Sequence, residues 1–129
     1  MITGKKLCER VIGCAQNVSR EMGAGFLEKV YESALCVELS QAGITFQCQK
    51  QFEIYYKSEK VGNYFADIVV EEKLLIELKA LSCFSREHDA QVMNYLKASE
   101  LTVGLLLNFG VTKLGIRRMV WNYDDKNNI

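Results

Sequence analysis

The sequence predicts an α/β or α+β domain in which helices cover a central sheet. Two observations predict it. The apolar residues change from a spacing of three and four to strict alternation and back, and the resulting elements follow in the order helix, helix, three strands, helix, strand, strand. The 129 residues are enough for one hydrophobic core, and no repeat or linker divides them. We expect one domain over residues 1–123 and a polar tail over residues 124–129.

Helical spacing occurs in three segments. Lys5–Glu21 has apolar residues three and four apart and is followed by Gly23, which tolerates the left-handed conformation of a helix end. Phe26–Gln41 has a broad apolar side and is followed by Gly43. The third predicted helix is Arg86–Ser99.

Five further segments alternate between apolar and polar residues or are continuously apolar, as strands are. They are Ile44–Tyr56, Val61–Val70, Leu74–Leu81, Thr102–Asn108 and Lys113–Trp121.

The composition excludes several classes of protein. Sixteen basic and sixteen acidic residues cancel, so net charge gives no sign of a strongly basic nucleic-acid binder. No segment reaches the ~20 apolar residues of a membrane helix, and the charged N-terminal region does not resemble a secretory signal. The five cysteines are odd in number and contain no CxxC pair, which argues against zinc and against a disulfide framework. We expect buried, reduced thiols in a cytoplasmic protein that does not associate with membranes.

Three charges interrupt the apolar hairpin of residues 64–80, and register brings them together. A three-residue loop, Glu71–Lys73, places Asp67 opposite Glu77, with Lys79 on the same face. This loop is favoured because it also puts one aliphatic set on a single face of the sheet. That set is Ala66, Ile68, Val70, Leu74, Ile76 and Leu78.

Two opposed carboxylates repel unless a cation lies beside them. Lys79 offsets part of this repulsion, and a divalent cation such as Mg²⁺, which prefers oxygen ligands, would offset more. The pattern therefore predicts a metal site for phosphodiester hydrolysis, with Asp67 and Glu77 as ligands and Lys79 assisting the attacking water or the transition state. The alternative is an exposed sheet face with an incidental ion pair.

Two helices offer further candidate groups. Glu28 and Tyr31 share one face of the second predicted helix, although the helix dipole alone favours an acid there and Tyr31 fits a core position. His88 and Gln91 share a face of the third, where they could contact phosphate or a water, or be locally satisfied. Nearby cations could contact phosphate or be scattered surface charges; they are Arg86, Lys97, Lys113, Arg117 and Arg118.

Several motifs, taken in order, resemble the GxxExxY protein family, which is assigned to the PD-(D/E)XK nuclease superfamily. They are Gly25-x-x-Glu28-x-x-Tyr31, Ala66-Asp67, Glu77-Leu78-Lys79-Ala80, His88-Asp89-Ala90-Gln91 and Leu107-Asn108-Phe109. The resemblance spans about Lys5 to Trp121. It implies a restriction-endonuclease-like αβββαβ core with a mixed sheet flanked by helices.

The resemblance also implies roles for individual residues. Asp67 and Glu77 would bind metal, Lys79 would be the catalytic lysine, Glu28 an additional acidic ligand and Gln91 a polar residue of the site. His88 matches a position that the family often fills with histidine, and Tyr31 and His88 are candidate substrate contacts. The sequence departs from the family by having Phe65 where members often carry a basic residue, and Ala66 where the superfamily's name has proline.

The leading interpretation is a nuclease that uses Mg²⁺ or Mn²⁺ to hydrolyse DNA or RNA. The first alternative is a catalytically inactive module of the same fold that binds nucleic acid or a protein partner. The second is a hydrolase of another phosphate ester. A homodimer is compatible with so small a domain.

Overall fold

The computed structural model describes residues 4–122, so the polar tail expected over residues 124–129 lies outside the described residues. The described chain contains a mixed five-stranded sheet and three helices, and the predicted α+β class is confirmed. The elements are α1 (Gly4–Met22), α2 (Glu28–Gln41), β1 (Phe46–Tyr56), β2 (Glu59–Val70), β3 (Leu74–Lys79), α3 (Arg86–Ser99), β4 (Val103–Asn108) and β5 (Gly115–Val120).

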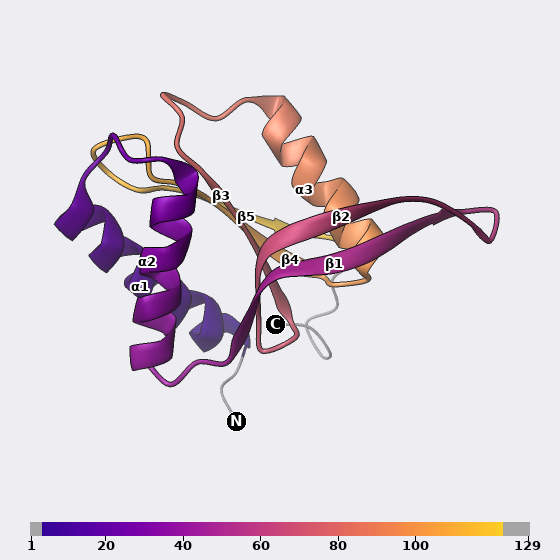
Figure 1. The fold of residues 1–129 in the computed structure, drawn as a ribbon, viewed down its shortest axis with the longest axis horizontal. Coiled ribbons are helices and arrows are strands. Elements are labelled where there is room, and N and C mark those ends of the chain that lie inside the picture. Colours follow the sequence, from indigo (N-terminus) through magenta and orange to yellow (C-terminus); the bar gives the residue numbers. More distant parts are fainter. Residues whose placement is uncertain (1–3, 123–129) are drawn as a thin grey trace.

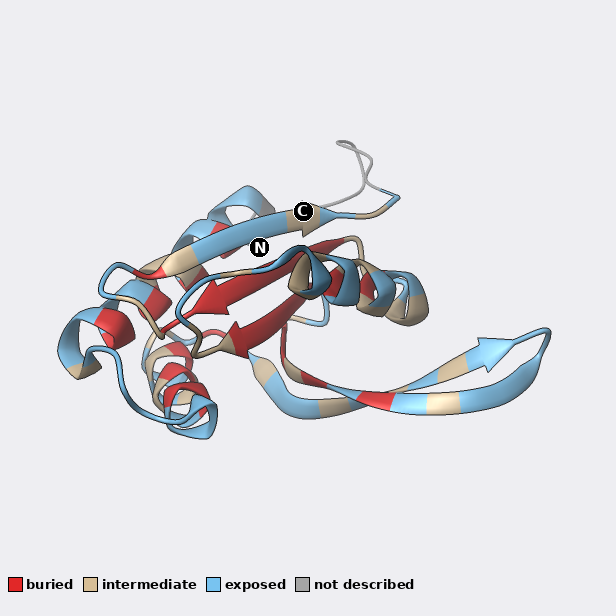
Figure 2. Ribbon diagram, turned by 90° about the horizontal axis from the view of Figure 1, so that it is seen from above, coloured by how far each residue is buried: buried red, intermediate tan, exposed pale blue. Residues whose placement is uncertain are grey.

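The sheet has the strand order β1-β2-β3-β4-β5, with β3 and β4 parallel and the other neighbours antiparallel. The crossover between the two parallel strands is α3, as a parallel pair requires. Helices α1 and α2 cover one face and α3 covers the other (Figure 1). Strands β3 and β4 are buried almost throughout (Figure 2), which explains their continuously apolar sequences.

Several boundaries differ from the sequence prediction by one or two residues, and two of the differences have local reasons. Helix α2 begins at Glu28 rather than at Phe26, because Leu27 has an extended backbone. Strand β2 begins at Glu59 rather than at Val61, because Lys57 and Ser58 both have positive φ and make a two-residue turn. Such turns match the twist of the strands that they connect.

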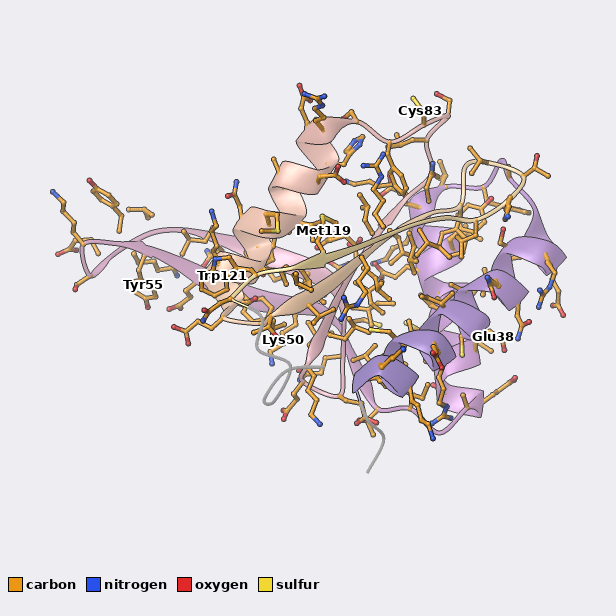
Figure 3. The ribbon with its side chains drawn as sticks, turned by 180° about the vertical axis from the view of Figure 1, so that it is seen from behind. Glu38, Lys50, Tyr55, Cys83, Met119 and Trp121 are labelled. Atoms are coloured by element: carbon orange, nitrogen blue, oxygen red, sulfur yellow. The ribbon has the colours of Figure 1, made fainter. Side chains whose placement is uncertain are left out.

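Strands β1 and β2 continue beyond the rest of the sheet as a two-stranded arm (Figure 1). The arm is mostly exposed in Figure 2, and Tyr55 lies in its outer part in Figure 3. At its base, the rings of Phe52, Tyr64 and Tyr95 stack, with centroids 5.3 Å and 4.0 Å apart. The arm is therefore anchored to α3 through these aromatic rings.

The predicted aliphatic face is largely confirmed. Ile68, Val70, Leu74, Ile76 and Leu78 all belong to the core under α1 and α2. Ala66 is the exception, because it packs with Tyr64 in the core under α3. Strand β2 pairs with β3 from Ile68 to Val70, and Ala66 lies in the part of β2 that pairs with β1.

The cysteine interpretation holds only in part. Cys8 and Cys14 are buried, but Cys36 is half-buried and Cys48 and Cys83 are exposed. All five are free thiols. None of the helices described between residues 4 and 122 is long and apolar enough to cross a membrane.

Candidate active site

The three-residue loop predicted between β2 and β3 is confirmed. Val70 pairs with Leu74 and Ile68 with Ile76, so Asp67 is the next residue along and lies opposite Glu77. Here the side chain of Asp67 replaces a regular ladder contact, because its Oδ2 accepts a hydrogen bond of 2.9 Å from the backbone N–H of Leu78. The carboxylate is thus held at the point where the two strands separate.

Glu77 is the most perturbed acid near this point. Its side chain is buried, and burial, the adjacent Asp67 charge and a hydrogen bond with Asp67 raise its pKa to about 9. Lys79 lowers the pKa, but by less than these causes raise it. At neutral pH the Glu77 carboxyl therefore retains a proton when no cation is present.

One oxygen of Glu77 also lacks a partner. Oε1 is buried without a hydrogen bond, although buried carboxyl oxygens are nearly always satisfied. A divalent cation fits this arrangement, because two adjacent carboxylates and an unsatisfied oxygen are ligands that Mg²⁺ accepts, together with water or phosphate oxygens. The residues that would hold it are Asp67 and Glu77.

The third predicted ligand does not join them. Among residues 4–122, no group of three His, Cys, Asp or Glu side chains is placed to hold a metal ion. Glu28 is exposed at the first turn of α2, where the helix dipole favours its charge. Of the three acids predicted as ligands, the structure brings Asp67 and Glu77 together and does not group Glu28 with them.

Lys79 ends β3 two residues beyond Glu77 and is half-buried on the same face of the strand. Its Cα partner in β4 is Asn108, and its backbone oxygen accepts a 2.8 Å hydrogen bond from the N–H of Phe109. Pairing with β4 thus fixes the backbone that carries the lysine.

Asn108 holds the chain immediately after Lys79. Its buried side chain accepts hydrogen bonds from the N–H groups of Leu81 and Gly110 and donates one to the Leu81 oxygen, at 2.9–3.0 Å. A Cβ on Gly110 would lie 2.3 Å from the Leu81 nitrogen, so a glycine is required there. The Leu107-Asn108-Phe109 motif therefore has a structural role that the sequence did not reveal.

Tyr31 is fully buried and connects α2 to this region. Its ring stacks on Phe109 with centroids 4.9 Å apart, and its hydroxyl donates to the Gly23 oxygen and accepts from the N–H of Phe26. These contacts fix the loop between α1 and α2. Of the two roles left open for Tyr31, the core role fits this position and a substrate contact does not.

Two residues that the sequence did not single out support Asp67. The amide of Gln49 donates to Asp67 Oδ1 at 3.3 Å and to Glu32 Oε1 at 2.8 Å. Glu32 is buried on α2 and also forms a 2.9 Å ion pair with Lys29. Gln49 has a positive φ of 52° within β1. Glu32 could have been noticed because it follows Glu28 by four residues, but only strand register places Gln49 opposite Asp67.

Helix α3 contributes a further residue, Tyr95, that the sequence did not single out as part of the site. Burial and the charges of Glu77 and Asp67 raise the pKa of Tyr95, and its hydroxyl forms a side-chain hydrogen bond with Gln91. Gln91 and Tyr95 thus lie on the side of α3 that faces the acids. The i, i+4 spacing of these two residues was the available signal.

His88 and Arg117 have contacts of their own. The Nδ1 of His88 accepts a 3.0 Å hydrogen bond from the N–H of Ser85, completing a capping box at the start of α3. Arg117 pairs with Asp89 at 2.7 Å and lies over the Phe84 ring. Arg86, Lys97, Lys113 and Arg118 are exposed.

Comparison with known proteins identifies the superfamily. A family model described as PD-(D/E)XK nuclease superfamily matches residues 5–119. The chain belongs to the PD-(D/E)XK nuclease superfamily. This confirms the superfamily to which the resemblance pointed, while membership of the narrower GxxExxY family stays a prediction. No curated protein matches the sequence significantly.

A solved structure supports the fold independently. The crystal structure of SSO0001 is similar with a TM-score of 0.59 and 14% sequence identity, over 76% of this chain and 52% of that protein. The chain thus spans about half the length of that protein. At this identity the likeness shows the fold alone, and functions are argued from sites rather than folds. In this member of the PD-(D/E)XK superfamily, the sequence positions that match the letters D, (D/E) and K of the motif are Asp67, Glu77 and Lys79.

Proposed function

We propose that the protein is a divalent-cation-dependent nuclease that hydrolyses phosphodiester bonds of DNA, or of RNA. The observation that carries the proposal is the acid pair at the end of the β2–β3 ladder, with a buried, unsatisfied oxygen on Glu77 and a lysine beside it. Membership of the nuclease superfamily supports the same reaction class.

Asp67 and Glu77 would hold a Mg²⁺ or Mn²⁺ ion. When bound, such an ion polarises the phosphate and lowers the pKa of a water molecule. Glu77 gives up its proton when it becomes a ligand, since a coordinating carboxylate must be ionised. Asp67 is kept in position by the Leu78 N–H and the Gln49 amide.

The lysine and the α3 side chains complete the site. The Lys79 ammonium would add positive charge where negative charge grows on the phosphate, and it would orient the attacking water. The amide of Gln91 and the hydroxyl of Tyr95 supply hydrogen-bonding groups close to the acids. Glu77 is itself buried, which strengthens electrostatic effects there.

The test is cleavage of supercoiled plasmid, single-stranded DNA and RNA in Mg²⁺ and in Mn²⁺. We expect Glu77→Gln and Lys79→Ala each to reduce cleavage by at least ~100-fold, as loss of a group that stabilises the transition state does. Lys5→Ala, which removes an exposed lysine at the start of α1, is the matched control and should cleave normally.

Two outcomes distinguish the alternatives. Nucleic-acid binding that persists without cleavage, and does not change in Lys79→Ala, would indicate the inactive binding module. Cleavage of a small phosphate ester but of no nucleic acid would indicate the other hydrolase. The neutral net charge leads us to expect weak, salt-sensitive binding in either case.

A further inference from the structure

Two cysteines from different elements meet beside the candidate active site. Cys36 lies on α2 and Cys48 on β1, and their Sγ atoms are 2.8 Å apart although both are free thiols. A disulfide has an S–S length of about 2.05 Å, so the sulfurs need to approach by only about 0.8 Å to form the bond. The two residues are twelve positions apart in the chain.

The two thiols differ in their surroundings. Cys48 is exposed on β1, where an oxidant in solution can reach it, whereas Cys36 is half-buried. Burial, followed by the hydrogen bond with Cys48, raises the pKa of Cys36 to about 12. Cys36 therefore keeps its proton, and the accessible Cys48 is the thiol that meets the oxidant first.

We propose that Cys36 and Cys48 form a reversible disulfide when the protein meets a hydroperoxide. The thiolate of Cys48 attacks the OH-bearing oxygen of the hydroperoxide, the O–O bond breaks, and the leaving hydroxide or alkoxide takes the proton that Cys48 lost, to become water or an alcohol. The resulting sulfenic acid on Cys48 is attacked by the Cys36 sulfur, the S–O bond breaks, and the departing hydroxide takes the Cys36 proton. Two thiols lose two electrons in total, and one hydroperoxide is reduced.

The position of the bond makes it relevant to the site. Cys36 follows Glu32 by one helical turn, and Cys48 directly precedes Gln49. Glu32 and Gln49 are the pair whose contact supports Asp67. A bond between the cysteines would tie α2 to β1 beside that contact. The formation of the disulfide does not depend on the proposed nuclease activity.

The first test treats the full chain with hydrogen peroxide and maps its thiols by mass spectrometry without reduction. We expect the monomer to lose about 2 Da and to yield a cross-linked peptide that joins Cys36 to Cys48. Reduction with dithiothreitol should restore the original mass. Cys36→Ser and Cys48→Ser should each prevent the cross-link.

The matched control is Cys83→Ser, which should still form the cross-link. Cys83 is also exposed, but it lies in the loop before α3, well away from Glu38 of α2 and Lys50 of β1 in Figure 3. Sulfinic acid on Cys48 without a cross-link, or a cross-link that uses Cys83, would overturn the proposal.

The second test measures thermal unfolding. A bond that closes a loop of this length should raise the melting temperature of the oxidised wild type by roughly 5–10 °C, reversibly. The same treatment should leave Cys48→Ser unchanged. An oxidised wild type that melts at or below the temperature of the reduced protein would contradict the proposed geometry.

Discussion

Asn108 and Glu77 are both buried polar residues on neighbouring strands, β4 and β3, yet their surroundings are opposite. Asn108 makes three hydrogen bonds to the backbone of Leu81 and Gly110. Glu77 has a buried oxygen with no partner and a pKa of about 9. A satisfied buried amide stabilises the fold, whereas an unsatisfied buried acid destabilises it. The difference separates a structural residue from a candidate functional one.

The largest effect on stability is expected at Asn108. Asn108→Ala leaves three backbone groups without their partner, and should lower the free energy of unfolding by about 2–4 kcal/mol. Urea denaturation followed by circular dichroism measures it. Asn94→Ala, which alters an exposed asparagine of α3, should change stability by less than ~0.5 kcal/mol. Equal losses of stability in Asn108→Ala and Asn94→Ala would contradict a structural role for the hydrogen bonds of Asn108.

Glu77→Gln should raise the free energy of unfolding, whereas Asn108→Ala lowers it. The folded protein keeps the Glu77 proton up to a pKa of about 9, while the unfolded chain releases it near pH 4.5. Between these values the folded state binds more protons, so the contribution of Glu77 to stability falls as pH rises. The glutamine can donate to Asp67 as the protonated acid does, and should stabilise the protein by about 1–3 kcal/mol at pH 8.

Unfolding curves measured from about pH 5 to about pH 8 test this. This range lies between the pKa of Glu77 in the unfolded chain and its pKa in the folded protein. The advantage of Glu77→Gln should grow as pH rises and should shrink when Mn²⁺ is added, because the cation stabilises only the wild type. A variant that is less stable than the wild type by the same amount at every pH would show that Glu77 is not strained by its surroundings.

Gln49→Gly should act on the site with a smaller effect. The substitution removes the side-chain amide that supports Asp67. Glycine also tolerates the positive φ of this position, so the backbone should not be strained. We expect Mn²⁺ affinity to fall about 10-fold, as for other groups that orient a metal ligand. Calorimetric titration measures this, and Gln51→Gly on the same strand is the control. Equal affinities in the two variants would exclude a supporting role for Gln49.

The smallest expected effect is at Tyr31. Tyr31→Phe keeps the stacking on Phe109 but loses the hydroxyl contacts with Gly23 and Phe26, at a cost of about 1 kcal/mol in the free energy of unfolding. Mn²⁺ and nucleic-acid binding should not change. Weaker nucleic-acid binding at unaltered stability would instead restore Tyr31 as a substrate contact.

Local patterns were sufficient for the elements and for the hairpin register. The apolar spacing predicted every helix and strand of the described chain, because each must turn one face to the core. Only a three-residue loop puts the aliphatic residues of both strands on one face of the sheet. This loop places Asp67 opposite Glu77. The prediction for Ala66 was wrong because the alternation that places Ile68 and Val70 under α1 and α2 does not continue to Ala66.

The sequence by itself thus determined the elements, the superfamily motifs and the meeting of two acids with a lysine. Only the tertiary structure decided which of the other motif residues build the fold, as Tyr31, His88 and Asn108 do. It also brought Glu32, Gln49 and Tyr95 to the acids and Cys36 to Cys48. The physical reason is that these contacts join separate elements, whose relative placement is set by packing across the whole sheet rather than by local spacing.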